Sequence, residues 1–178
     1  GVFMQAPATT SSMKDKLQIA IITYNRKEYI ERTLKQLLDK NSPVKEFDII
    51  ILDNASTDGT SELIEKFCQK YPNLKHIRHS VNVGGNANII KAFEYAISSG
   101  KEYFWGLCDD DIFDFSNWDE VVKNIEQKKD IICVSHYAIH YGEKGEISLS
   151  DKLLQMTFFP AGIYRTDLLE ANVLTNNL

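Results

Sequence analysis

The chain lacks an excess of positive charge, and this absence excludes one broad class of partner. Its 178 residues carry 20 lysines and arginines against 25 aspartates and glutamates, a formal net charge of −5. Proteins that bind nucleic acid neutralise its phosphates with a basic surface, so no nucleic acid partner is expected. An anionic ligand must therefore be held locally, by a cation or by backbone N–H groups.

Long hydrophobic runs and metal-type cysteine pairs are also lacking. No window approaches 18 consecutive apolar residues, so no transmembrane segment is predicted. The three cysteines, Cys68, Cys108 and Cys133, are scattered and odd in number, which favours reduced thiols in a cytoplasmic protein. Peripheral attachment at the inner face of the membrane stays compatible with this composition.

What is present is the composition of a single globular domain, with 43% hydrophobic and 25% charged residues. Residues 1–16 are small and polar, and we expect a disordered leader or tag remnant there. The folded domain is expected over 17–178. Apolar runs predict buried strands at Leu17–Thr23, Phe47–Leu52 and Tyr103–Cys108.

Segments with helical spacing alternate with these strands. Helices are expected at Glu28–Leu38, around Leu63–Phe67, around Ile89–Ile97 and at Ser116–Gln127. Asn25 and Ser116 are the expected N-caps of the first and last of these helices. A more polar strand, Leu74–His79, suits a position near the sheet edge, and further strands are expected at Ile131–Ile139 and Thr157–Tyr164. This alternation predicts an α/β fold, a mostly parallel sheet flanked by helices on both faces.

The strongest chemical signal is the acidic end of the third apolar run. After Cys108 the chain continues with Asp109, Asp110 and Asp111, where a strand leaves the sheet at its ligand-binding edge. In an extended chain, Asp109 and Asp111 would share one face. Two such carboxylates suit Mg²⁺ or Mn²⁺ together with phosphate oxygens. The simpler alternative is an acidic run that favours a helix starting at Ser116.

Two other strand ends carry polar clusters, Thr23-Tyr24-Asn25 and Asp53-Asn54. A parallel sheet brings such ends to one edge, so the three clusters should meet in a single crevice. Taken singly, each has a structural alternative. Asp53-Asn54 is compatible with loop chemistry ahead of a helix, and Gly84-Gly85 with a tight turn.

Four motifs, in this order, resemble the family 2 glycosyltransferases of GT-A fold. They are Thr23-Tyr24-Asn25-Arg26, Asp53-Asn54-Ala55-Ser56-Thr57-Asp58-Gly59-Thr60, Asn82-Val83-Gly84-Gly85 and Asp109-Asp110-Asp111. The match covers roughly residues 17–125. The resemblance implies a GT-A (Rossmann-like) fold and an inverting, metal-dependent hexosyltransferase that uses a nucleotide-sugar donor.

The resemblance also implies roles for individual residues. Those implied for the donor nucleotide are Thr23, Tyr24, Asn25, Asp53, Asn54, Gly85, Asn88, Asp109 and Asp110. Asp53 would accept a hydrogen bond from the base, and a carboxylate against the ring N–H of uracil favours UDP without excluding dTDP. Asp109 would reach the ribose or the metal, and Asp111 would bind the Mn²⁺ or Mg²⁺ that bridges the diphosphate. Three acids in a row permit two alignments, so the choice between Asp110 and Asp111 stays open.

By resemblance, the sugar passes to the hydroxyl of a glycan or lipid-linked glycan acceptor, in bacterial surface polysaccharide synthesis. A general base must take the proton of that hydroxyl. In the family, the base lies well beyond the acidic strand end. The acidic residues in that part of the chain are Glu143, Glu146, Asp151, Asp167 and Glu170. None lies in a recognisable motif. We expect that the chain lacks the C-terminal part of the acceptor region and binds a nucleotide sugar without turning it over.

Two alternatives of other classes stay open. A receiver-like signalling domain shares the run Ile49–Asp53 followed by Asp58-Gly59, but it needs an acidic pair after its first strand and a lysine after its last. A non-catalytic nucleotide-sugar-binding domain would show the same motifs as an enzyme. Dehydrogenases and nucleotidyltransferases need a glycine-rich turn after the first strand, where this chain has Tyr24-Asn25-Arg26-Lys27.

Overall fold

A six-stranded sheet organises the protein. The structure, a computed structural model, describes residues 12–134 and 162–169. The strand order is β3-β2-β1-β4-β6-β5. The strands are β1 (Leu17–Thr23), β2 (Ile49–Asp53), β3 (Leu74–Arg78), β4 (Tyr103–Cys108), β5 (Ile131–Cys133) and β6 (Gly162–Arg165). The first four run parallel, and β6 is antiparallel to both β4 and β5.

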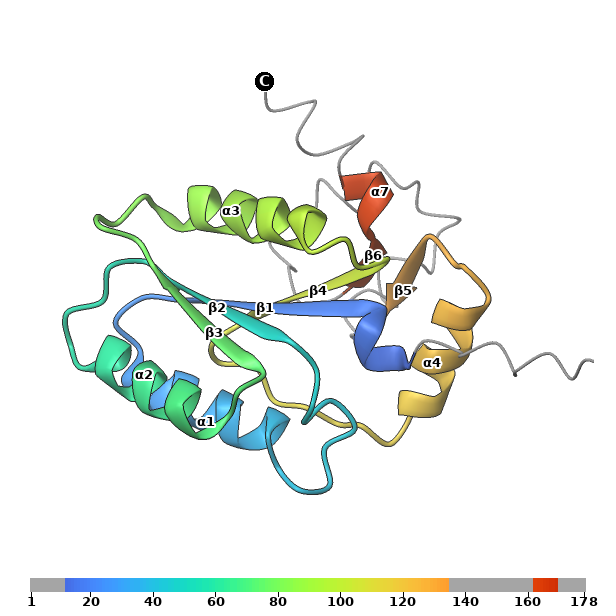
Figure 1. The fold of residues 1–178 in the computed structure, drawn as a ribbon, viewed down its shortest axis with the longest axis horizontal. Coiled ribbons are helices and arrows are strands. Elements are labelled where there is room, and N and C mark those ends of the chain that lie inside the picture. Colours follow the sequence, from blue (N-terminus) through green and yellow to red (C-terminus); the bar gives the residue numbers. More distant parts are fainter. Residues whose placement is uncertain (1–11, 135–161, 170–178) are drawn as a thin grey trace, which may run out of the picture.

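Helices cover both faces of this sheet (Figure 1). They are α1 (Lys27–Leu37), α2 (Thr60–Lys70), α3 (Gly85–Ser98), α4 (Trp118–Glu126) and the short α7 (Thr166–Leu169), with a 3-10 turn η1 (Met13–Asp15) before β1. Figure 1 places α3 and α7 on one face and α1, α2 and α4 on the other. The predicted α/β architecture is confirmed.

The central strand β1 is buried because it contributes to two hydrophobic cores. Ile19 and Ile21 pack in the core beneath α1, α2 and α4, while Ala20 belongs to the core beneath α3. Alternate side chains of a strand point to opposite faces, so a strand between two helix layers must be apolar throughout. The sequence Leu-Gln-Ile-Ala-Ile-Ile-Thr meets that demand with two polar exceptions, Gln18 and the final residue, Thr23. The amide of Gln18 donates to backbone carbonyls.

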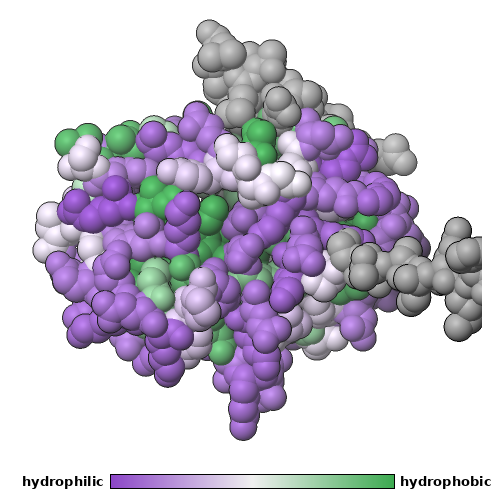
Figure 2. Space-filling view, in the orientation of Figure 1, coloured by the Kyte–Doolittle hydropathy of each residue, from purple (hydrophilic) through white to green (hydrophobic). Residues whose placement is uncertain are grey.

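The polar strand β3 lies at the edge of the sheet, as its composition predicts. Leu74 is buried in the core on the α1 and α2 side, whereas Lys75 and Arg78 are exposed. In the space-filling view the molecule is mostly hydrophilic, with hydrophobic residues visible between the two helix layers (Figure 2). In the described ranges, no helix is both long and apolar enough to cross a membrane.

Both predicted N-caps are wrong. Arg26 is the N-cap residue of α1 and Asn117 that of α4, and neither makes a side-chain capping bond. Asn25 takes a left-handed backbone conformation, with φ of 48°, and its side chain caps a different loop. Ser116 N–H donates instead to the carboxylate of Asp114, 2.9 Å away. Local spacing predicted the helices but not the hydrogen-bond partners of these two residues.

The described structure includes the turn η1, which lies before the predicted domain boundary at residue 17. Met13 packs against the core, and the carbonyl of Lys16 accepts the N–H of Tyr103 at 2.8 Å. Residues 1–11 lie outside the described residues. The predicted strands Ile131–Ile139 and Thr157–Tyr164 are described only in part, as β5 and β6.

Candidate functional site

The carboxyl ends of β2, β1 and β4 meet at one edge of the sheet. Thr23 pairs in register with Asp53, and its hydroxyl donates to Asp109 Oδ2 at 2.9 Å. Thr23 is buried, as are both aspartates. The predicted meeting of the three polar clusters is therefore confirmed.

Asn25 joins the first cluster to the second. Its backbone N–H donates to Ser56 Oγ at 2.9 Å, and its Oδ1 accepts the Thr57 N–H at 2.7 Å. Asparagine is among the few residues that tolerate the left-handed conformation this requires. Tyr24 beside it is 44% exposed, so its ring remains available at the same edge of the sheet.

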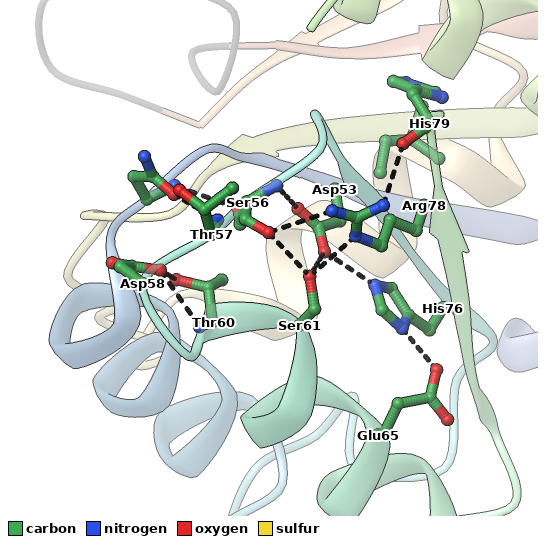
Figure 3. A network of polar contacts seen from close by, with 12 residues as sticks. Asp53, Ser56, Thr57, Asp58, Thr60, Ser61, Glu65, His76, Arg78 and His79 are labelled. Atoms are coloured by element: carbon green, nitrogen blue, oxygen red, sulfur yellow. Dashed lines mark hydrogen bonds and ion pairs between the residues drawn. The ribbon is translucent and has the colours of Figure 1, made fainter. Parts of the chain in front are cut away.

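Asp53 lies at the centre of a buried polar network (Figure 3). Its Oδ1 accepts the Ser56 N–H at 3.0 Å, and its Oδ2 accepts the Ser61 hydroxyl and pairs with His76 Nε2 at 2.9 Å. Arg78 completes the network by donating to Ser61 Oγ and to the Ser56 carbonyl, both at 3.1 Å. The carboxylate has no exposed surface. Contact with a nucleotide base remains a prediction.

His76 connects the strand end to helix α2. Its Nε2 faces Asp53 and its Nδ1 faces Glu65, as the close-up shows (Figure 3). An ionised carboxylate only accepts hydrogen bonds, so a carboxylate at each ring nitrogen favours the doubly protonated imidazolium. Burial alone would lower the pKa of His76, but the two carboxylates outweigh burial and raise it. Burial would likewise raise the pKa of Asp53, but hydrogen bonds from His76, Ser56 and Ser61 hold it well below its usual range.

Two asparagines, Asn54 and Asn82, tie the loop after β2 to the loop after β3. Asn54 Nδ2 donates to Asn82 Oδ1 at 2.9 Å, and Asn54 Oδ1 accepts the Val83 N–H at 2.8 Å. Asn88, also buried, donates to the Leu52 carbonyl at 3.1 Å and contacts His79. Asn54 and Asn88 thus have structural partners.

Of the two glycines in this loop, Gly84 is the one whose conformation demands glycine, with φ of +86°. Gly85 is exposed and is the first residue of α3. A Cβ atom at Gly85 would meet no heavy atom of another part of the chain within 4 Å, so the space beside this residue is open.

The three consecutive aspartates form a turn and do not continue the strand, so the predicted alternation of faces does not apply. Asp109 is buried and accepts from Thr23 on one oxygen, while its other oxygen pairs with Arg26 Nη1 at 3.3 Å. Asp110 is more exposed and pairs with Arg26 Nη2 at 3.4 Å. Asp111 Oδ2 turns back to accept the Cys108 N–H at 2.9 Å.

The two carboxylates at the ends of the triplet are poorly solvated. Burial raises the pKa of Asp109, although Thr23 and Arg26 oppose the shift. Burial, with the nearby charges of Asp110 and Asp109, raises the pKa of Asp111 to about 6. A carboxylate in this condition gains from a nearby cation.

Helix α1 fixes the backbone of the acidic turn through consecutive carbonyls. Thr33 Oγ1 donates to the Asp109 carbonyl at 2.5 Å, Arg32 to the Asp110 carbonyl at 3.2 Å, and Gln36 to the Asp111 carbonyl at 3.1 Å. Gln36 also accepts the Phe113 N–H at 3.0 Å. The turn is therefore held in place by the helix.

The donor set at this turn fits a hard divalent cation. Among the described residues, no three histidine, cysteine or acidic side chains form a ready-made metal cluster. Mg²⁺ typically takes only one or two carboxylates and completes its shell with phosphate oxygens and water. Desolvated Asp109 and Asp111, with Asp110 between them, can supply that number.

One acidic candidate for the general base, Asp167, lies among the described residues. Asp167 belongs to α7 and pairs with Arg165. The residue before it, Thr166, donates its N–H to the carbonyl of Glu102, directly before β4. Asp109 follows the other end of this strand, about 20 Å away at 3.3 Å per residue. Asp167 therefore lies far from the acidic turn. The other four candidates, Glu143, Glu146, Asp151 and Glu170, lie outside the described residues.

Sequence reasoning missed Arg26, His76 and the α1 residues that hold the turn. Gln36 and Thr33 are three apart, a spacing that puts them on one helix face. Within β3, His76 falls on the same face as buried Leu74. Those signals mark buried polar residues, but they do not reveal their partners, which lie 11 to 84 residues away in the sequence.

Comparison with known families agrees with this geometry. The sequence model of Glycosyl transferase family 2 matches residues 18–173 of the chain. The chain belongs to glycosyl transferase family 2. This assignment confirms the resemblance carried by the four motifs and sets aside the receiver-like domain.

Two curated relatives illustrate how far the likeness extends. The poly(ribitol-phosphate) beta-N-acetylglucosaminyltransferase TarS of Staphylococcus aureus is 28% identical over 171 residues, covering 88% of this chain and 29% of TarS. The abequosyltransferase RfbV of Salmonella typhimurium is 35% identical over 96 residues, covering 53% of this chain and 28% of RfbV. The chain spans less than a third of either relative.

Solved structures show the same GT-A fold. TarS 1-349 in complex with UDP superposes with a TM-score of 0.63 at 26% identity, covering 88% of this chain and 48% of that one. The mannosyltransferase PcManGT of Pyrobaculum calidifontis, in complex with GDP-Man and Mn²⁺, gives a TM-score of 0.60 at 15% identity, covering 88% and 46%. The second likeness shows the fold alone.

Proposed function

We propose that this chain is the donor-binding part of a glycosyltransferase that moves a sugar from a UDP-sugar to an acceptor hydroxyl with inversion. The observation that carries this is the meeting of Thr23, Asp53 and Asp109 at the carboxyl edge of the sheet, the edge where open α/β sheets bind ligands. Structures of TarS with UDP and with UDP-GlcNAc support a UDP donor. The proposed acceptor is a glycan or lipid-linked glycan of a bacterial surface polysaccharide.

Asp53 is the proposed contact for the base. Its Oδ1 accepts one described hydrogen bond, from the Ser56 N–H, and a carboxylate oxygen can accept a second from the ring N–H of uracil. The network around His76 keeps this carboxylate ionised, the form that only accepts hydrogen bonds. Because Asp53 is fully buried, we expect the neighbouring loops to open as the base enters.

Asp109 and Asp111 are the proposed ligands of a divalent cation, with the diphosphate completing its shell. When bound, such a cation stabilises the negative charge that develops on the departing nucleoside diphosphate. The chain's own part is to hold the carboxylates in position. The Thr23 hydroxyl orients Asp109 and the Cys108 N–H orients Asp111.

Two substitutions separate the base contact from the cation contact. Asp111→Asn is expected to lower UDP affinity about tenfold or more in Mn²⁺ and to leave it unchanged in EDTA, because only the cation is lost. Asp53→Asn is expected to lower UDP affinity by about tenfold in both conditions, because a charged acceptor is lost. Isothermal titration calorimetry measures both. Asp114→Asn, at an exposed position in the same region, is the control and should bind like wild type. Equal affinities for all four proteins would refute the assignment of both aspartates.

A non-catalytic nucleotide-sugar-binding domain is the second candidate. Such a domain would share the contacts of Thr23, Asp53 and Asp109, because these concern donor binding and not proton transfer. We also propose a cytoplasmic location, supported by the free thiols Cys68 and Cys108.

A further inference from the structure

Arg26 pairs with two carboxylates of the acidic turn, the groups that a cation would need. Its guanidinium lies 3.3 Å from Asp109 Oδ1 and 3.4 Å from Asp110 Oδ2, so one side chain bridges two of the three carboxylates. The other oxygen of Asp109 accepts the Thr23 hydroxyl. A cation that binds Asp109 therefore competes with Arg26 for the oxygen that Thr23 does not use.

We propose that Arg26 is a built-in counter-ion that must release Asp109 and Asp110 before a divalent cation binds, which makes cation binding depend on the nucleotide. This inference rests on the proposed function and concerns the regulation of the same site. Without nucleotide, the guanidinium of Arg26 already balances the charges of Asp109 and Asp110, so cation affinity is low. With UDP present, phosphate oxygens add ligands for the cation and shift the exchange in its favour.

The structure allows Arg26 to move where the other groups cannot. Thr23 is buried within β1, and the turn's carbonyls are held by Arg32, Thr33 and Gln36 of α1. The side chain of Arg26, in contrast, is 40% exposed. In the same position its guanidinium lies 4.2 Å from the ring centroid of Tyr29, a cation–π partner that is itself 43% exposed.

The test is Mn²⁺ affinity without nucleotide, measured by the EPR signal of free Mn²⁺. Arg26→Gln is expected to bind Mn²⁺ about threefold to tenfold more tightly than wild type, the range that follows from losing two partly exposed ion pairs. Arg26→Lys keeps the charge but cannot pair with both carboxylates at once, so its Mn²⁺ affinity should fall between those of wild type and Arg26→Gln. The gain in Mn²⁺ affinity on adding UDP should be smaller for Arg26→Gln than for wild type.

Lys35→Gln is the matched control. It removes the same charge from helix α1, which begins directly after Arg26, but Lys35 pairs with Glu31 at 2.9 Å, one turn earlier on that helix, and its side chain is 66% exposed. Its Mn²⁺ affinity should stay within about twofold of wild type. Unchanged or weaker binding by Arg26→Gln, or an equal gain in Lys35→Gln, would overturn the proposal.

The absence of Mn²⁺ binding in every protein would also overturn the proposal, together with the cation part of the proposed function. UDP titration of the same samples in EDTA reports on the nucleotide site separately. It distinguishes a wrong role for Arg26 from a wrong function for the site.

Discussion

His76→Ala is expected to destabilise the protein by about 3–5 kcal/mol, the range for breaking a buried ion pair by removing one partner. Asp53 has no exposed surface, and the His76 side chain that faces it is 5% exposed. Without the imidazolium, the buried charge of Asp53 keeps only the neutral donors Ser56 and Ser61. Urea unfolding at pH 6 measures the change. The control Lys75→Ala, at an exposed position on the same strand, should stay within about 0.5 kcal/mol of wild type.

The stability difference between wild type and His76→Ala should depend on pH with a defined sign. The folded pKa of His76 is raised above its ordinary value of 6.5. Its stabilising protonation is therefore complete below 6.5 and is lost as pH rises through the folded pKa. The folded pKa of Asp53 lies below its ordinary 3.8, so its contribution is present above 3.8 and is lost only as pH falls through the folded value.

The difference in unfolding free energy between wild type and His76→Ala should therefore be largest near pH 6 and become smaller toward pH 9. A difference below about 1 kcal/mol, outside the range for a broken buried pair, would argue against the network. A difference that does not change between these pH values would argue against an imidazolium at His76.

Phe104→Ala is expected to destabilise the protein by about 3–5 kcal/mol, as large-to-small changes of buried aromatic residues do. Phe104 is fully buried on β4, and its ring meets that of Phe93 on α3 edge-on, with centroids 5.4 Å apart. Ala92 and Ala96 on the same helix are too small to fill the space that the ring would leave.

Urea unfolding of Phe104→Ala, with Phe104→Leu beside it, tests this packing. Leucine retains most of the buried apolar volume, so its loss should be less than half that of alanine. Equal losses for the two variants would contradict the view that cavity volume sets the effect. A loss below about 1 kcal/mol for alanine would contradict the packing of α3 against β4 itself.

The sequence predicted those parts of the fold that depend on local pattern. Apolar runs identified β1, β2 and β4 because a strand between two helix layers has no polar face, and the polar residues of Leu74–Arg78 identified an edge strand. The antiparallel pairing of β6 with β4 was not predicted, since it joins residues about 60 positions apart. The same limit applied to Asn25, whose side chain caps Thr57 although local spacing predicted a cap for α1.

For the candidate site too, features that follow from local pattern were predicted and features that depend on distant contacts were not. Thr23, Asp53 and Asp109 were predicted because strand ends of a parallel sheet converge whatever their sequence. The conformation of the acidic turn was not predicted, because it depends on Thr33 and Gln36 of α1, more than 70 residues earlier in the chain. Arg26 and His76 were missed for the same reason, since each acquires its role from a carboxylate on another element.

The most direct test of the donor site is calorimetric titration of the folded chain with UDP, GDP and dTDP, each with Mn²⁺ and with EDTA. The account predicts binding that is strongest for UDP and that weakens when the cation is removed. Failure of a folded chain to bind any of the three nucleotides would contradict it, and the GT-A fold would remain without a donor site.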